Sequence, residues 1–239
     1  NNDGNGNNSG HVRVYQYNSS NDSWTKLGAD IDGDAASDKS GHSVSLSGDG
    51  SILAVGAIEN DGNGNNSGHV KVYVYNSSNN SWSQRGLDID GEAANDQSGW
   101  SVSLSNDGSI VAIGAIKNDG HPYVNNGHVR VYEWRQYTSN DAGVYHPSTT
   151  SLTQDSNQTK PIIITDSSGP TASNYYWTQL GSDINGEAND ESGFSVSLSS
   201  NGSRVAIGAI TSPGQGTDSG HVKVYEYNSS NNSWTQLGN

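Results

Sequence analysis

The chain has 239 residues, of which 30% are hydrophobic, and its 25 acidic and 11 basic residues give a net charge of −14. This charge repels phosphate backbones, so we expect no nucleic-acid partner. No apolar run approaches the roughly 20 residues that cross a bilayer, so we expect no membrane insertion.

Cysteine is absent, which excludes disulfides and thiolate metal sites. Methionine is absent even at position 1, so we expect a processed product or an excerpt of a longer chain. The low share of hydrophobic residues indicates a thin core that recurs along the chain, which is typical of repeat proteins.

One segment recurs through the chain. The six residues Gly10–Tyr15, GHVRVY, return almost unchanged from Gly68, Gly127 and Gly220. The intervals are 58, 59 and 93 residues, so the last one contains an insertion of about 34 residues, which we place within 135–175.

Each repeat predicts four β-strands, and the second complete copy shows them in order. Residues 101–105 alternate apolar side chains with serine, which is typical of a strand with one buried face. An Asp-Gly turn leads to the apolar strand 110–115. A third strand follows at 128–132 and a fourth ends at 177–180, and no helical period is present.

Four antiparallel strands in about 58 residues are typical of a propeller blade. We therefore predict an all-β fold, a β-propeller-like array of four-stranded antiparallel blades forming one domain over residues 1–239. The small serine side chains of the first strand favour the crowded hub. The array comprises a half blade at 10–28 and three complete repeats at about 41–86, 99–180 and 193–238.

The half repeat leaves two interpretations open. The sequence is a portion of a longer propeller, or the incomplete blade is an edge that a partner strand completes.

Four tryptophans occupy equivalent positions in the fourth strands. We expect them to pack between neighbouring blades, and platforms for sugar rings are the alternative. They are Trp24, Trp82, Trp177 and Trp234.

The order of motifs resembles the FG-GAP repeat of β-propellers. It runs through Trp24–Leu27, Asp32–Asp38, Ser40–Gly50 and Leu53–Ala57, and recurs further along the chain. The family's Phe-Gly pair is altered to glycine followed by a ring, as in Gly99-Trp100. The resemblance implies a propeller, commonly extracellular, used for adhesion or ligand binding, and we expect a protein that is not an enzyme.

Acidic residues at alternate positions follow each fourth strand, with a glycine that permits a sharp turn. Such oxygen ligands are what calcium requires, so calcium is the one cofactor we consider. The alternative is that these side chains accept backbone N–H bonds and shape the loop. The candidate ligands are Asp30, Asp32, Asp34, Asp38, Asp88, Asp90, Glu92, Asp96, Asp183, Asn185, Glu187 and Asp190.

This chain departs from the family at the loop that usually binds calcium. In calcium-binding members that loop joins the first two strands as D-x-D-x-D-G, whereas this chain has only Gly48-Asp49-Gly50 and its equivalents there.

Four histidines begin the third strands: His11, His69, His128 and His221. Separate blades would hold them apart, so we expect each to hydrogen-bond to a neighbouring loop rather than to share a metal.

The insertion breaks the symmetry of the repeats, and long insertions are usually functional or disordered. We predict a recognition surface there, with a decorative loop as the alternative. Its candidate residues are Tyr137, Tyr145, His146, Ile162, Ile163 and Ile164.

These observations favour a non-enzymatic, extracellular structural or adhesive module of a surface appendage, filament or virion, located outside the cell or on the cell or virion surface. Its expected partners are further copies of itself or other surface proteins. A carbohydrate-binding, lectin-like propeller, with or without calcium, is the alternative, with glycans as partners. A hydrolase with its active site in the insertion is a third hypothesis.

Overall fold

The computed structural model describes residues 4–119, 125–136, 175–211 and 219–238. Over these residues the chain forms sixteen β-strands and no helix, so the all-β prediction is confirmed. None of the described segments forms a helix long and apolar enough to span a bilayer.

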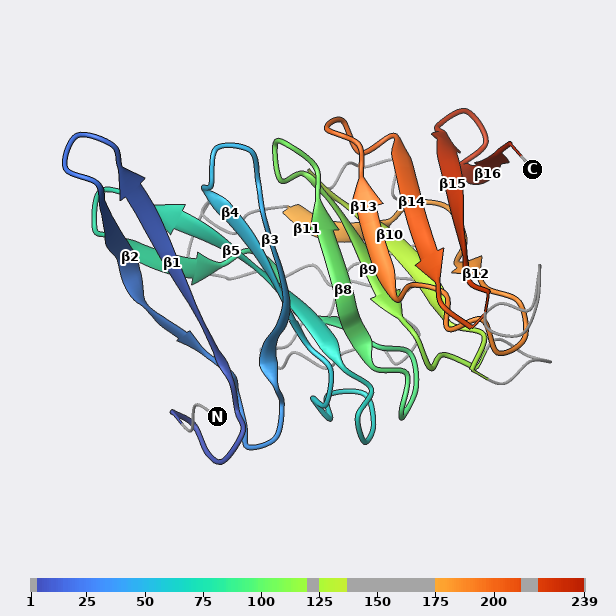
Figure 1. Ribbon diagram of the computed structural model, residues 1–239, viewed down its shortest axis with the longest axis horizontal. Helices are drawn as coiled ribbons and strands as arrows, with labels where there is room; N and C mark the ends of the chain where they lie inside the picture. Colours follow the sequence, from blue (N-terminus) through green and yellow to red (C-terminus); the bar gives the residue numbers. More distant parts are fainter. Residues whose placement is uncertain (1–3, 120–124, 137–174, 212–218, 239) are drawn as a thin grey trace, which may run out of the picture.

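The strands group into a half blade and three four-stranded antiparallel blades, in the predicted order (Figure 1). The half blade pairs β1 (His11–Asn18) with β2 (Ser23–Asp32). The first blade contains β3 (Ser40–Leu46), β4 (Ile52–Ala57), β5 (His69–Asn76) and β6 (Ser81–Gln84). The second contains β8 (Ser98–Leu104), β9 (Ile110–Ala115), β10 (His128–Gln136) and β11 (Tyr175–Gln179). The third contains β13 (Ser195–Leu198), β14 (Arg204–Ala209), β15 (His221–Asn228) and β16 (Ser233–Leu237).

Two short strands add a feature that the sequence analysis missed. β7 (Ile89–Asp90) pairs with β5, and β12 (Ile184–Asn185) pairs with β10. In the half blade the same pairing is made by the far end of β2. A two-residue strand has no period to detect, but its isoleucine is buried against the next blade.

The first strands of neighbouring blades lie against one another. The backbone N–H of Leu104 donates to Ser45 Oγ, and that of Leu198 to Ser103 Oγ, both at 3.0 Å. These contacts need short side chains at the point where the blades converge. The predicted position of the serine-rich strand nearest the hub agrees with them.

Glycine in the second strand is required by the same close approach. A Cβ at Gly56 would lie 2.2 Å from the carbonyl oxygen of Gly99 in the next blade, and a Cβ at Gly114 would meet the Gly193 carbonyl at the same distance. Real Cβ atoms do not come this close, so the backbones of adjacent blades touch only because these positions lack a side chain.

The core lies between blades rather than inside any one of them. Val70 and Val72 of the first blade pack with Val111 and Ile113 of the second in one cluster of buried side chains. The clusters on either side repeat this arrangement. The thin, repeated core expected from the composition is therefore confirmed.

Tryptophans fasten each blade to the one before it. Trp82 Nε1 donates to the carbonyl oxygen of Leu27 at 3.0 Å. Trp177 Nε1 donates to Arg85 O at 3.0 Å, and Trp234 Nε1 to Leu180 O at 2.7 Å. The predicted packing between blades is confirmed for these three rings.

Candidate functional site: histidine and carboxylate clusters between blades

Two clusters of one histidine and two carboxylates lie at the blade interfaces. In each, one carboxylate comes from the loop of the preceding blade and the other from the turn before the short strand. The candidate ligand atoms of each cluster all lie within 4.8 Å of one another. The first cluster is Asp34, His69 and Asp88, and the second is Glu92, His128 and Asp183.

Backbone pairing places each histidine at this point. His69 pairs in register with Ala57 on one side and Asp90 on the other, and His128 pairs with Ala115 and Asn185. The preceding Gly68 has a φ of 71°, and a Cβ there would lie 2.2 Å from the Ser98 carbonyl oxygen of the next blade. The Gly-His pair of the repeat therefore fixes where the imidazole emerges.

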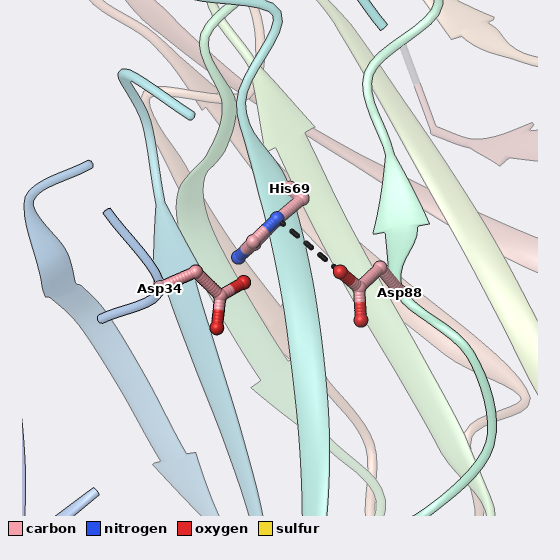
Figure 2. A group of neighbouring side chains, drawn as sticks. All are labelled: Asp34, His69 and Asp88. Carbon is pink, nitrogen blue, oxygen red and sulfur yellow. Dashed lines mark ion pairs between the residues drawn. The ribbon is translucent and has the colours of Figure 1, made fainter. Parts of the chain in front are cut away.

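In the first cluster the two carboxylates stand on opposite sides of the His69 imidazole (Figure 2). His69 Nδ1 lies 3.7 Å from Asp88 Oδ2, beyond a hydrogen bond. The Lys71 ammonium contacts Asp34 Oδ2 and lies 3.6 Å from Asp88 Oδ2. Burial lowers the pKa of His69, so its imidazole is neutral near pH 7 and Lys71 supplies the positive charge.

In the second cluster an arginine takes the place of the lysine. The Arg130 guanidinium contacts Glu92 Oε1, and its Nε lies 3.0 Å from Asp183 Oδ1. His128 Nδ1 lies 3.7 Å from Glu92 Oε2 and 3.9 Å from Asp183 Oδ2. Burial lowers the pKa of His128, and its Nδ1 has no hydrogen-bond partner among the described residues.

A polar cavity of about 400 Å³ opens beside the second cluster. Carboxylates and amides dominate its wall, so it favours cations and water over apolar ligands. Its lining residues are Glu92, Ala93, Ala94, Asp96, Asn118, Asp119, Asp183 and Asn185.

Three of the twelve predicted calcium ligands cap their own loops. Asp38 Oδ2 accepts the Ala35 N–H, and Asp96 Oδ2 accepts the Ala93 N–H, both at 2.9 Å. Asp190 makes the equivalent bond to the Glu187 N–H, also at 2.9 Å. These buried side chains follow the loop-shaping alternative.

The other predicted ligands are divided among the half blade, the short strands and the interfaces. Asp30 pairs with Arg13 and Lys26, and its hydrogen bond with Arg13 is the main cause of its lowered pKa. Glu187 pairs with Lys223 at 2.9 Å. Asp32 ends β2, and Asp90 and Asn185 lie on the short strands β7 and β12. The twelve residues therefore do not form one site, and calcium binding by them stays a prediction.

The family's calcium loop does not fit the residues at the turn between β3 and β4. Asp49 Oδ1 accepts hydrogen bonds from the Ser51 N–H, the Ser51 hydroxyl and the Ser47 hydroxyl. The bond from the Ser51 N–H is the main cause that lowers the pKa of Asp49 to about 2. The Asp49 carboxylate is therefore engaged by hydrogen bonds within its own turn. In the third blade the equivalent Asn201 accepts the same hydrogen bonds without a charge.

The four histidines lie in separate blades, as expected, but the predicted hydrogen bond to a neighbouring loop is wrong for Nδ1 of His11 and of His128, which have no partner among the described residues. The basic residue two positions after each histidine was missed. Its signal was present, because the four copies read Arg13, Lys71, Arg130 and Lys223. The six predicted recognition residues, Tyr137, Tyr145, His146, Ile162, Ile163 and Ile164, lie outside the described part of the chain.

The FG-GAP repeat family matches residues 25–75 and 87–132, so the chain contains FG-GAP-type repeats, as the motifs predicted. These segments include the residues of the first cluster and Glu92, His128 and Arg130 of the second. No curated protein matches the chain.

The structure is similar to solved propeller-like proteins. A putative 6-phosphogluconolactonase from Bacteroides fragilis is 11% identical with a TM-score of 0.50, and the match covers 95% of this chain and 47% of that one. A putative 6-phosphogluconolactonase from Bacteroides uniformis is 10% identical over 95% and 62%, with a TM-score of 0.38. The Pseudomonas aeruginosa periplasmic gluconolactonase PpgL is 15% identical over 95% and 62%, with a TM-score of 0.34. The chain thus spans about half the length of the first of these proteins.

The first of these neighbours corrects one expectation. The prediction that the chain is not an enzyme was wrong, because the fold that it was based on is shared with a protein described as a putative lactonase. At 11% identity the likeness shows the fold, and no catalytic residue is transferred from it.

Proposed function

We propose that this chain is an extracellular structural or adhesive module of a surface appendage, filament or virion, in which one copy joins the next, blade against blade. One observation carries the proposal. The first and last described blades present the two unmatched halves of the contact that holds the internal blades together, and a further blade, of the same protein or of another copy, completes each of them.

The internal contact has the same parts on either side of the second interface, where the half blade meets the first blade and the second blade meets the third. A tryptophan ring lies over a glycine that follows the fourth strand of the preceding blade, and a Cβ at Gly181 would lie 2.8 Å from Trp234 Cδ1. The N–H of this glycine donates to Asn232 Oδ1 at 2.8 Å. Gly28 makes the same bond to Asn80 at 2.8 Å, so ring, amide and glycine form a repeated unit.

The N-terminal half blade presents the ring without its glycine. Trp24 is 67% exposed and Tyr15 is 47% exposed. They belong to β2 and β1, the strands drawn in blue at one end of the row in Figure 1. The equivalent rings Trp82 and Tyr73 are packed against the half blade. An exposed tryptophan is the kind of side chain that anchors protein interfaces.

The C-terminal blade presents the glycine without its ring. A Cβ at Gly238 would meet no atom within 4 Å. Val222 is 69% exposed, whereas Val129 at the equivalent position is fully buried. Trp24 of one copy fits this face of the next, and such a head-to-tail contact builds filaments or rings.

The experiment is light scattering with size-exclusion chromatography over a range of concentrations, followed by electron microscopy. We expect concentration-dependent oligomers that Trp24→Ala removes. Leu87→Ala is the matched control, because Leu87 is 43% exposed but belongs to the first blade, between the two ends. A wild-type chain that stays monomeric, or oligomers that survive Trp24→Ala, would contradict the proposal.

A second candidate function, carbohydrate binding, is favoured by a row of rings across three blades. The centroids of His42 and Trp100 are 4.7 Å apart, and those of Trp100 and Phe194 are 5.8 Å apart. His42 and Phe194 are exposed, and partly exposed aromatic faces can stack on sugar rings. A glycan array tests this, and a Trp100→Ala variant that keeps full glycan binding would exclude the row as the binding surface.

A further inference from the structure

We propose that Glu92, His128 and Asp183 form a binding site for one divalent transition-metal ion of the zinc class at the interface of the first and second blades. The proposal is independent of the assembly function, because it involves neither end of the row. Imidazole nitrogen and carboxylate oxygen are ligands that Zn²⁺ accepts, whereas Ca²⁺ takes six to eight oxygens.

The distances between the donor atoms suit such an ion. A tetrahedral ion with bonds of about 2.0–2.2 Å holds its ligand atoms about 3.3–3.6 Å apart. His128 Nδ1 lies 3.7 Å from Glu92 Oε2 and 3.9 Å from Asp183 Oδ2. Side-chain movements of a few tenths of an ångström would bring both pairs into range.

His128 supplies the observation that points to a ligand. The residue is 3% exposed, and its Nδ1 has no hydrogen-bond partner in the described part of the chain. A buried polar atom without a partner is costly.

Arg130 supports this site, because it binds mainly the opposite oxygens. It contacts Glu92 Oε1 and Asp183 Oδ1, while Oε2 and Oδ2 face His128. Weaker contacts reach the inner oxygens, from Arg130 Nη2 to Asp183 Oδ2 at 3.5 Å and from Asn118 Nδ2 to Glu92 Oε2 at 3.3 Å. Gln179 Nε2 also donates to Asp183 Oδ1 at 2.7 Å. Such outer partners orient metal ligands.

Charge and access also favour a cation. Two carboxylates and one guanidinium leave the cluster with one negative charge, and Asp96 and Asp119 line the same cavity. The cavity of about 400 Å³ leaves room for water at the remaining coordination position. Three protein ligands with an open fourth position are typical of reactive zinc sites.

The first cluster has no room for a metal ion, for a physical reason. The Lys71 ammonium contacts Asp34 Oδ2 and lies 3.6 Å from Asp88 Oδ2, the same oxygen that faces His69 Nδ1 at 3.7 Å. The chain's own cation therefore occupies the place of an ion. We expect one tight metal site per chain, and not two.

The experiment uses the untagged chain after treatment with a chelator. Calorimetric titration with Zn²⁺ should give one ion per chain, and Co²⁺ should give the visible absorption of a low-coordinate N/O site. His128→Gln should weaken Zn²⁺ binding by about tenfold or more. His69→Gln is the matched control, because it removes the equivalent imidazole from the first cluster and should leave the affinity unchanged.

Asp183→Asn is the second variant, and circular dichroism establishes that each variant is folded. It should also lose at least tenfold in affinity, with the absorption of bound Co²⁺ changed. The proposal is overturned if the wild-type chain binds no Zn²⁺ or Co²⁺, if Ca²⁺ competes equally, or if His69→Gln reduces the affinity as much as His128→Gln. Oligomerisation measured on the same samples separates this result from the assembly proposal.

Discussion

The two histidine clusters occupy equivalent places in neighbouring interfaces, yet they differ at two positions, Asp34 against Glu92 and Lys71 against Arg130. In the first, a flexible ammonium on Lys71 reaches between the carboxylates. In the second, the planar guanidinium of Arg130 bridges two carboxylates and leaves their other oxygens toward His128. The lysine ammonium is a compact charge that lies between the carboxylates, whereas the arginine guanidinium is a planar fork that binds their outer oxygens. The first cluster is therefore filled by its own cation, and the second is left open to a metal ion.

The largest effect should come from removing Arg130. Its side chain is 8% exposed, and Arg130→Ala would leave Glu92 and Asp183 facing each other without a cation. We expect a loss of about 1–2 kcal/mol in the free energy of unfolding, because a buried guanidinium that bonds to two carboxylates is lost. Urea unfolding in the presence of a chelator measures it.

Lys71→Ala is the comparison for that measurement. It should cost about 1 kcal/mol, because Asp34 is 48% exposed and water can replace the ammonium there. Equal losses for Lys71→Ala and Arg130→Ala would mean that the two cations perform the same task.

A second consequence of Lys71→Ala concerns metal binding. If the ammonium fills the first cluster, its removal should open a second Zn²⁺ site at Asp34, His69 and Asp88, weaker than the first because its carboxylates are less buried. The titration should then change from one ion to two. A Lys71→Ala chain that still binds one ion would show that something other than the ammonium closes this cluster.

The smallest effect should be the dependence of stability on pH. Burial lowers the pKa of His69 and His128 from the ordinary value of 6.5, so the unfolded chain binds protons more readily than the folded chain does. This contribution is present above about pH 6.5 and is lost as the pH falls toward the folded-state pKa values.

Unfolding at pH 7.5 and 5.5 tests this without metal. The wild-type chain should be less stable at the lower pH, and His128→Gln should reduce the difference. If the stability of the variant falls by as much as that of the wild type, His128 is not responsible for the pH dependence.

The regular parts of the blades could be predicted because they satisfy local rules. A few neighbouring residues are enough to predict each of these elements. Examples are the alternating Val102 and Leu104, the Asp107-Gly108 turn and the apolar run from Ile110. The short strand at Ile89–Asp90 could not, because two residues carry no period and their pairing with β5 is set by the fold.

The candidate site could be predicted only in part. Its acidic residues stood out, but they were assigned together to calcium. In the structure Asp96 accepts a hydrogen bond within its own loop, whereas Glu92 pairs with Arg130 of the next blade. The basic residue after each histidine recurred in plain view as His-Val-Arg or His-Val-Lys. Its role was hidden because its partners are 17 to 53 residues away along the chain.

The sequence by itself determined the repeat, the strand order of each blade and the FG-GAP type, because these depend on periods, turns and spacings that neighbouring residues encode. The tertiary structure decided which carboxylate meets which cation, that His128 Nδ1 has no hydrogen-bond partner among the described residues, and that Trp24 is exposed. Those features arise between blades, where residues from distant parts of the chain are brought within a few ångströms and burial sets their charge.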